Sequence, residues 1–342
     1  MTAARATPGE LSSSASVPTR LERWLADHDP ARRRRGEAAA QALYGARYAA
    51  LGAACNVYTS IDPARWLAQF GVLVERGPGL RDLGSSAAAD EALVAAAIAW
   101  LEEHGAYVTG SKDRAVLFGA VRRYLALKRY CAEEQIAFCS LAGDDVGADL
   151  PAALLNDLAD FEGTKTPVVC VASHGGDANG ALTAHLLHLA SDKQPVLTTR
   201  LDRYDAATGL FHLRADPGAA PFFARRDVEN PAESVRATVR LADGRLTFDV
   251  APADEVTFAR IARRTGRFVC VLLRGAFVDL AAAATGPARP GGVRAAARLM
   301  NVDGETLTAA LASSRLHAAP GDHVASMKAA CDALDIEPLM PD

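Results

Sequence analysis

Apolar and polar positions follow two different patterns, and the change between them divides the chain. From about residue 47 to residue 200, short apolar runs such as 168–172 alternate with segments whose apolar positions recur every three or four residues. Buried strands and amphipathic helices produce these patterns. After Asp205, runs such as ATVRLADGRLTFDV alternate apolar and polar residues, which is typical of strands with one covered face. The pattern predicts an α/β part followed by a mostly antiparallel β part.

The first part is expected to contain a parallel sheet flanked by helices. Asp62-Pro63 predicts a helix start, because Pro is favoured at the first helical position, and Gly71 predicts its end. Further strands are predicted at 48–58 (strand and turn), 72–74 and 136–141, and further helices at 21–44, 87–104, 112–133 and 150–158. Strands that alternate with helices predict a parallel sheet with helices on both faces.

The segment 164–204 carries the most informative local pattern. An apolar strand at 168–172 runs through the glycine turn SHGGDANG into a helix, and a second strand starts near residue 196. Strand, helix and strand over about 40 residues predict a βαβ unit, in which ligands bind beyond the strand ends. The turn places His174 and Asp177 there as a candidate base and acid. In the alternative interpretation, Asp177 only caps the helix.

The last third is expected to form an antiparallel sheet or a small barrel. Asp243-Gly244 predicts a hairpin, 268–273 a strand, 285–292 a surface loop and 324–334 a closing helix. The expected domains are a disordered tail at 1–20, an α/β domain with a leading helix at 21–165, and a C-terminal domain at 166–342.

Composition narrows the class of partner. The net charge of −4 and an aromatic content of 6% argue against a nucleic-acid partner. No apolar run approaches the length that spans a bilayer, so we expect no membrane partner. Six scattered cysteines without C-x-x-C spacing indicate buried thiols in a reducing cytoplasm. Small molecules and further copies of the chain are the expected partners.

Two motifs have a simple interpretation beside a functional one. The run Arg32–Arg35 can meet phosphate or an acidic surface, but a solvated helix face is the simpler interpretation. His185 and His188 lie three residues apart on a predicted helix and can share a face. A helix surface or core edge is the simpler interpretation there, and a metal pair is the alternative.

Three segments together resemble one family. They are ALYGARYAALGAACNVYTSIDPARWLAQFGVLVE, NGALTAHLLHL and HAAPGDHVASMKAACDALDIEPL, in this order between Ala42 and Leu339. The chain is similar in these segments to L-fucose isomerases, of the fucose and arabinose isomerase superfamily. The resemblance implies the second and C-terminal domains of that family. Its members carry a further N-terminal domain that is missing here, so we expect either a homo-oligomer or a complex with a companion chain.

The resemblance also implies a chemistry. Family members interconvert an aldose and a ketose through an enediol, with Mn²⁺ held by a Glu, an Asp and a His. The cation polarises the sugar oxygens while carboxylates move a proton between neighbouring carbons. This chemistry implies a sugar substrate. Because active sites in the family lie between subunits, the resemblance also implies an oligomer, either a trimer or a hexamer.

Carried over residue by residue, the family's metal ligands are only partly present. The position of the Glu falls at Ala152, and Asp149 is the nearest substitute. The Asp falls at Asp177 in the shorter version of the loop and at Gly176 in the longer one. The sequence therefore retains at most one clear family carboxylate, and we expect any Mn²⁺ site to be weak.

The other matched positions also depart from the family. The family has an acidic residue two positions before its metal-binding Asp. In this chain that position is Gly175, which follows His174. The metal His falls at Arg315, with His317 two residues later, and the guanidinium of Arg315 would favour an anionic substrate group. In the following strand, Thr199-Arg200-Leu201-Asp202 replaces the family's A-D-V-R text.

These positions define the predicted site. The catalytic candidates are Asp177, His174 and His317; the substrate-binding candidates are Arg315, Asn179, Arg200 and Asp202; and the metal candidates are Asp177, His317 and Asp149. One hypothesis is an aldose–ketose isomerase acting on a sugar or sugar-like compound. A second is a catalytically degenerate sugar-binding or regulatory subunit that assembles with another chain. A metal-free lyase or epimerase that uses His174 and Asp177 is the third.

Overall fold

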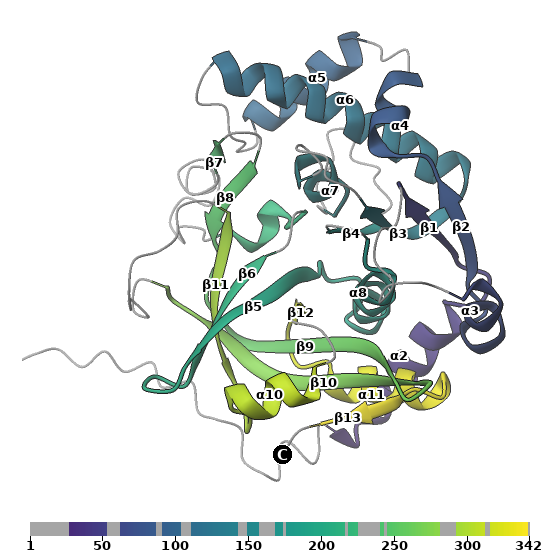
Figure 1. Ribbon diagram of the computed structural model, residues 1–342, viewed down its shortest axis with the longest axis vertical. Helices are drawn as coiled ribbons and strands as arrows, with labels where there is room; N and C mark the ends of the chain where they lie inside the picture. The colour runs from purple at the N-terminus through teal and green to yellow at the C-terminus, as the bar shows by residue number, and fades with distance from the viewer. Residues whose placement is uncertain are drawn as a thin grey trace, which may run out of the picture.

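Two separate β-sheets organise the molecule (Figure 1). The computed structural model describes residues 27–52, 62–86, 91–103, 111–142, 149–156, 168–173, 176–215, 218–224, 240–242, 245–280, 292–311 and 315–340. Within them, helices flank a four-stranded parallel sheet, and a second sheet forms an antiparallel barrel. The predicted tail 1–20, most of the predicted loop 285–292, the turn Asp243-Gly244 and His174 lie outside these ranges.

The parallel sheet has the strand order β2-β1-β3-β4. Its strands are β1 (Arg47–Leu51), β2 (Leu73–Gly77), β3 (Ile136–Ala142) and β4 (Val169–Ser173). Tyr48 and Phe138 point to one face, and Leu51 and Cys139 belong to the core on the other. Strands β3 and β4 are largely buried on both sides, which explains their nearly continuous apolar sequences, whereas the edge strand β2, LVERG, has no fully buried residue. The prediction of a parallel sheet between helical layers is confirmed.

The helices around this sheet follow mostly local signals. They are α3 (Pro63–Phe70), α4 (Leu80–Ser86), α5 (Glu91–Glu103), α6 (Ser111–Glu133), α7 (Asp149–Asn156) and α8 (Ala178–Ala190). The Asp62 carboxylate accepts a hydrogen bond from Arg65 N, and Gly71 ends α3 at φ 68°. Both predicted boundaries of that helix are confirmed. Helix α4 was not predicted, because its sequence LRDLGSS is short and contains poor helix formers.

The second sheet closes into a barrel. Its barrel strands are β5 (Leu197–Asp205), β6 (Leu210–Ala215), β9 (Ala253–Arg264), β10 (Arg267–Val278), β11 (Val293–Leu299) and β12 (Arg315–Pro320). They pair antiparallel in the order β10-β9-β12-β5-β6-β11, and β11 pairs back to β10. The barrel interior holds apolar side chains such as Phe258, Leu273 and Leu316. The antiparallel, barrel-like C-terminal part is confirmed.

Three further strands extend the sheet beyond the closed ring. Strand β8 (Arg245–Asp249) pairs with β11, β7 (Arg240–Ala242) pairs antiparallel with β8, and β13 (Glu337–Leu339) pairs with β10. The pairing of β7 with β8 confirms the predicted hairpin.

The prediction of a βαβ unit around the glycine turn was wrong. Strand β4 belongs to the parallel sheet, but β5, which follows α8, pairs antiparallel with β6 and β12 in the barrel. The sequence of β5, LTTRLDRYD, is mostly polar and leaves Arg200, Asp202 and Arg203 exposed. A strand with one wet face suits an antiparallel barrel better than the centre of a parallel sheet. Helix α8 therefore carries the chain from one sheet to the other.

Helix α8 lies between the two sheets (Figure 1). It packs on β3 and β4 on one side and on β9 and β12 on the other, within one apolar cluster that includes Leu186 and Ile261. Thr183 Oγ1 accepts a hydrogen bond from Ile261 N at 2.9 Å, so a helix side chain satisfies a strand amide of β9. Helix α8 thus joins both sheets in this apolar cluster, and a second apolar cluster also contains residues of both sheets.

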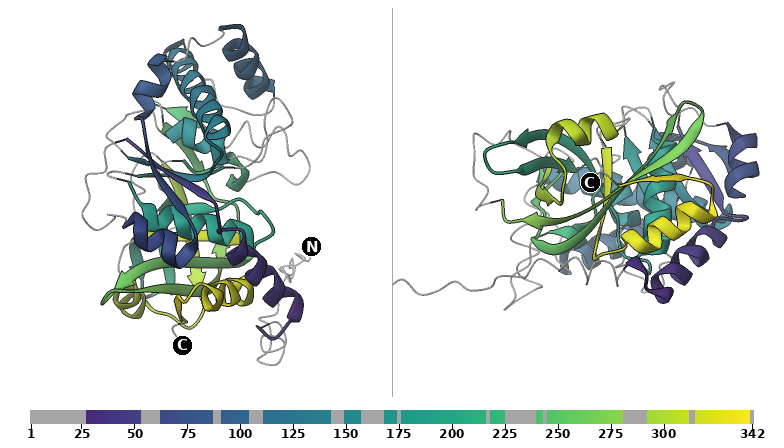
Figure 2. Two further views of the ribbon diagram at one scale, coloured as in Figure 1. Left: turned by 90° about the vertical axis from the view of Figure 1, so that its right-hand side faces the viewer. Right: turned by 90° about the horizontal axis from the view of Figure 1, so that it is seen from below.

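The leading helix α2 (Pro30–Gln41) packs along α11 (Val324–Ala333) (Figure 2). Gly36 allows the close approach, because a Cβ there would lie 2.0 Å from the Ser326 carbonyl oxygen. In the run Arg32–Arg35, Arg32 forms an ion pair with Asp322 at 2.9 Å, and Arg33 pairs with Glu37 within the helix. The run is partly structural, and helix α11 confirms the predicted closing helix.

Histidine 185 is buried in the core between α8 and the parallel sheet. Its ring stacks on Phe138, with ring centroids 4.5 Å apart, and its Nδ1 has no hydrogen-bond partner among the described residues. Burial, with a contribution from His188, lowers the pKa of His185 to about 3. His188 Nδ1 lies 2.8 Å from the Gln194 carbonyl oxygen. Both rings have packing roles, in agreement with the simpler interpretation of this pair.

We expect Gly36→Ala to destabilise the fold, because its methyl group would meet backbone across the α2–α11 contact. Overpacking of this kind costs roughly 1–3 kcal/mol of unfolding free energy. The matched control is Gly119→Ala in α6, where, among the described residues and apart from the helix's own backbone, only the Arg123 guanidinium lies within 4 Å of the added methyl group. That change should stabilise the protein by about 0.5–1 kcal/mol through helix propensity. Urea unfolding of both variants tests the pair, and equal effects would refute the close-approach argument.

We expect acid to destabilise the fold partly through His185. Its folded pKa of about 3 lies below the usual 6.5, so only the unfolded chain gains a proton as the pH falls through 6.5. The stability contribution is complete above pH 6.5 and is lost down to pH 3. Between pH 7 and pH 5 the loss is about 2 kcal/mol. His185→Phe should flatten the unfolding free energy over this range in denaturant titrations, whereas an unchanged slope would contradict the assignment.

Candidate functional site

Asp177 is the first residue of the candidate site and the N-cap of α8. Its Oδ1 accepts a hydrogen bond from Gly180 N at 2.8 Å, and its side chain is fully buried. Gly176 precedes it at φ 77°, a conformation that glycine adopts without strain. The structure therefore confirms that Asp177 caps the helix, which was the alternative interpretation of this residue. Burial at this point leaves a carboxylate that needs a partner of opposite charge.

Arg260, from the middle of β9, supplies that charge. Its Nη1 lies 2.7 Å from Asp177 Oδ2 and its Nη2 lies 3.1 Å from Oδ1, which makes a bidentate pair. The arginine is itself buried, at 5% exposure. Its Nε has no hydrogen-bond partner among the described residues. A buried bidentate pair fixes both distance and orientation, so β9 is held against the start of α8.

Two residues of β12 complete the cluster. His317 is fully buried, with Nε2 at 3.3 Å from Arg260 Nη1 and Nδ1 at 3.1 Å from Thr198 Oγ1. Because a guanidinium only donates, Nε2 accepts and Nδ1 carries the ring proton. Arg315 Nη1 lies 3.5 Å from Asp177 Oδ2. Asp177, His317 and Arg315, which were predicted as site residues, thus lie together, and Arg260 joins them.

The charges of the cluster fix its protonation. Burial alone would raise the pKa of Asp177, but Arg260, His317 and Arg315 outweigh it and lower the pKa to about 2. Burial, reinforced by Arg260 and Arg315, lowers the pKa of His317 to about 3 although Asp177 opposes the shift. At neutral pH the site therefore holds an ionised carboxylate, two guanidinium groups and a neutral imidazole.

A second group of polar side chains lies on the neighbouring strands. Tyr48 Oη and Ser140 Oγ are 2.6 Å apart and buried, and burial raises the pKa of Tyr48. Ser173 Oγ, at the end of β4, is buried without a hydrogen-bond partner among the described residues. These hydroxyls come from β1, β3 and β4. They add neutral donors and acceptors at the sheet but no further charge.

The remaining predicted site residues are more scattered. Asn179 lies in the first turn of α8, where its carbonyl oxygen accepts a hydrogen bond from Thr183 Oγ1. Arg200 and Asp202 lie on β5 and are exposed. Asp149 begins α7, and its side chain, like the whole of His174, lies outside the described residues. Their predicted roles stay predictions.

Arg260 was not predicted as a site residue, although its sequence context contains a signal. The segment VTFARIA places a single cation inside an otherwise apolar strand. A charge buried in a strand needs a counter-charge from elsewhere in the fold. The sequence therefore indicates that Arg260 needs a counter-charge. It does not identify Asp177 as the partner, because Asp177 lies 83 residues away.

The residues present do not fit the Mn²⁺ centre that the family resemblance implies. Asp177 Oδ1 accepts from Gly180 N and Arg260, and Oδ2 accepts from Arg260 and Arg315. A carboxylate offers about four acceptor sites, so these four donors leave none for a metal. Both ring nitrogens of His317 are also engaged. Among the described residues, no three His, Cys, Asp or Glu side chains form a metal-binding group.

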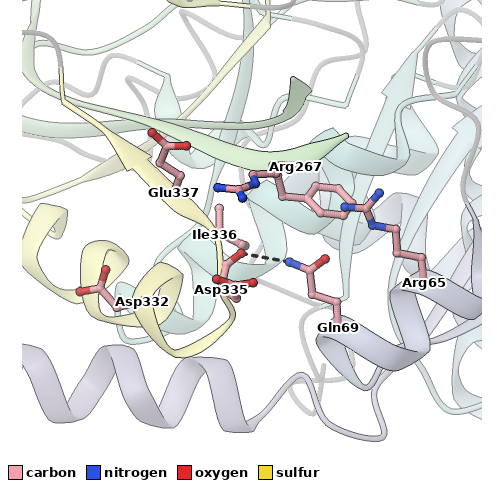
Figure 3. A pocket seen from close by; sticks show the side chains of 8 residues that line it. Arg65, Gln69, Arg267, Asp332, Asp335, Ile336 and Glu337 are labelled. Atoms are coloured by element: carbon pink, nitrogen blue, oxygen red, sulfur yellow. Dashed lines mark hydrogen bonds between the residues drawn. The ribbon is translucent and has the colours of Figure 1, made fainter. Parts of the chain in front are cut away.

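A separate surface pocket of about 550 Å³ lies where α3 meets the barrel and the end of α11 (Figure 3). It is lined by Arg65, Gln69, Arg267, Phe268, Asp332, Asp335, Ile336 and Glu337. The Arg65 guanidinium stacks over Phe268 and donates to the Gly266 carbonyl oxygen, while Gln69 donates to two carbonyl oxygens next to α11. These contacts join α3 to the barrel, and none of the Asp177 cluster lines this pocket.

Comparison with known proteins leaves the family open. No protein-family model matches the chain, and no curated protein matches it. In the described part of the chain, no helix is both long enough and apolar enough to cross a membrane.

We expect the Asp177–Arg260 pair to be strongly coupled in stability. Arg260→Met leaves a buried carboxylate without its main counter-charge, and Asp177→Asn leaves a buried cation. Removing one partner of a buried pair costs roughly 3–5 kcal/mol of unfolding free energy. The double variant should cost at least about 2 kcal/mol less than the sum of the two single changes.

The control for this cycle is the exposed i,i+4 pair Arg33–Glu37, with side chains 78% and 49% exposed. Exposed pairs of this kind contribute little, so its double-mutant cycle should show no measurable coupling. Chemical unfolding of both sets checks the comparison. Additive effects at Asp177 and Arg260 would mean that the buried pair does not hold the two elements together.

Proposed function

We propose that the chain is an L-fucose isomerase-like protein whose metal site has been replaced by an internal ion pair. It acts as a non-catalytic, sugar-binding regulatory subunit that assembles with another chain. The alternative, an aldose–ketose isomerase, requires a free carboxylate and a metal or an equivalent electrophile at the same place. The two functions make opposite demands on Asp177.

The saturation of Asp177 is the observation that carries the proposal. Its four acceptor sites face the Gly180 amide, both Nη atoms of Arg260 and one Nη of Arg315. A general base must accept a proton during turnover, and efficient bases have a pKa near the working pH. The pKa of Asp177, at about 2, is far below that range. This carboxylate is suited to holding structure rather than to moving protons.

The arginine at the position of the family's metal His supports the same conclusion. Arg315 lies 3.5 Å from Asp177 Oδ2, so a fixed protein cation stands beside the retained carboxylate. A guanidinium cannot lose its proton in this setting and offers no lone pair to a metal. The charge of the carboxylate is balanced without Mn²⁺.

The sugar-binding part of the proposal rests on the family resemblance and on the architecture. A helix-flanked parallel sheet joined to an antiparallel barrel is the fold that the resemblance implied. The polar side chains Tyr48, Ser140 and Ser173 lie on adjacent strands of that sheet. These hydroxyl groups are buried in the structure, so the sugar-binding part of the proposal rests mainly on the family resemblance.

Metal analysis and turnover assays test the proposal directly. We expect protein purified without chelator to hold no stoichiometric Mn²⁺ by mass spectrometry. We also expect no interconversion of aldoses and ketoses in a panel of pentoses and hexoses, with or without added Mn²⁺. Thermal shift with the same panel should detect binding, because a ligand that binds only the folded state stabilises it.

Asp177→Asn separates the two functions. Recovery of stoichiometric Mn²⁺ that Asp177→Asn abolishes would overturn the proposal in favour of an isomerase. Turnover that Asp177→Asn abolishes, in a variant whose circular dichroism matches the parent protein, would do the same. Binding of a sugar without turnover, by the parent protein and by the Asp177→Asn variant, supports the proposal.

A further inference from the structure

Four arginines stand side by side across four adjacent barrel strands. In the strand registers, Arg315 of β12 lies opposite Arg200 of β5, Arg200 lies opposite Arg214 of β6, and Arg214 lies opposite Arg294 of β11. Directly opposed residues in antiparallel pairs place their side chains on the same face, with Cβ atoms roughly 4.5–5.5 Å apart. We name Arg315, Arg200, Arg214 and Arg294 the arginine row.

The arginine row lies on the outer face of the barrel. Its neighbours along the strands, Leu316, Leu213 and Ala295, belong to the apolar core, and side chains alternate along a strand. Arg200 is exposed, and the other three are partly exposed. The row is therefore accessible to a ligand in the described part of the molecule.

Only the two ends of the row meet carboxylates. Arg294 forms a bidentate pair with Asp249 of β8, with nitrogen–oxygen distances of 2.8 and 3.0 Å. Arg315 lies beside Asp177 at the other end. Among the described residues, neither Arg200 nor Arg214 has an ion pair or a side-chain hydrogen bond. Two adjacent guanidinium groups in the middle of the row are thus left uncompensated.

The residue pair next to the row consists of His212 on β6 and Arg203 on β5. Asp202 and Asp205 raise the pKa of His212 on the next rung, but burial and then Arg203 outweigh them and lower it. Arg203 Nη2 lies 3.3 Å from His212 Nε2. This neighbouring rung therefore presents a further cation beside a neutral ring. Like charges directly opposed across strands destabilise a sheet, and a row of them is compensated when an anion bridges the side chains.

We infer that the arginine row binds a phosphate group carried by a small ligand. Guanidinium groups match phosphate oxygens in a bidentate manner, and two adjacent free guanidinium groups suit a dianionic phosphate monoester. Arg200 and Arg214 contact the phosphate, and Arg315 connects this position to the Asp177 cluster. That the remainder of the ligand is a sugar rests on the proposed function.

A small phosphate ester fits the row better than a nucleic acid does. At its two ends the row is already compensated, because Arg294 is paired with Asp249 and Arg315 lies beside Asp177, so only its two central cations remain for a ligand. The chain as a whole is acidic, with a net charge of −4. Nucleic-acid surfaces have extended basic patches with excess positive charge.

Calorimetric titration of the full chain with inorganic phosphate, ribose 5-phosphate and ribose tests the inference. We expect phosphate and ribose 5-phosphate to bind, and added NaCl to weaken both through screening. Arg200→Gln and Arg214→Gln should each weaken phosphate binding about tenfold or more, since each removes a charged hydrogen-bond donor. The double variant should abolish it.

Arg298→Gln is the matched control. Arg298 is an exposed arginine on β11, the strand that carries Arg294, but it lies opposite Ala276 outside the row. The phosphate affinity of the Arg298→Gln variant should stay within about twofold of that of the parent protein, because the charge of a single distant, exposed side chain is screened. Without ligand, the Arg200 and Arg214 variants should keep or raise the melting temperature, because each relieves repulsion between like charges.

Each outcome decides between alternatives. No phosphate binding by the parent protein, or equal binding by the row variants and the parent, would overturn the inference. Tighter binding of a single-stranded oligonucleotide than of ribose 5-phosphate would overturn it in favour of nucleic acid. Phosphate binding that depends on Arg200 and Arg214 supports the row even if the proposed function fails. Binding of unphosphorylated sugars alone would support the proposed function and overturn the row.

Discussion

The buried contact between Asp177 and Arg260 is the interaction on which the arrangement of the two sheets depends. The carboxylate is fixed at the start of α8, and the guanidinium belongs to a barrel strand. An unpaired charge at this depth would cost several kcal/mol, so the helix and barrel are strongly held in this one relative placement. The other side of α8 packs on β3 and β4. The ion pair and α8 therefore act together with the contacts between α3 and the barrel to set how the parallel sheet meets the barrel.

The same contact limits the chemistry that the protein can perform. A carboxylate whose acceptor sites are all occupied holds structure well, but it makes a poor base and a poor metal ligand. Arg315 has two neighbours of different kinds. It faces the Asp177 carboxylate, and it is also the end member of the arginine row on the barrel surface. The positive charge beside Asp177 comes from arginine side chains that belong to strands of the barrel. Such charges attract anions and do not need to be recruited from solution.

The parts of the fold that sequence predicted well are those with local signals. Helix α3 begins at Asp62-Pro63 and ends at Gly71, because capping and backbone preferences act within a few residues. Strand β5 was assigned to the wrong sheet, since its partners lie at β6 and β12 and the pairing with β12 joins residues 119 apart. The site shows the same division. Asp177 was found from its glycine turn, whereas Arg260 needed a contact across 83 residues that no local pattern encodes.

The position of β12 inside the barrel has a consequence for how the chain is made. This strand comes near the end of the sequence, yet it lies between β9 and β5. A growing chain on the ribosome cannot close the barrel until residues 315–320 have emerged, because β5 and β9 have no partner on these edges before then. Asp177 likewise remains a hydrated carboxylate until Arg260 has been synthesised, and Arg315 and His317 follow later still. The barrel and its buried charges are therefore completed only after β12 has been made, with the open strand edges of β5 and β9 exposed to chaperones until that moment.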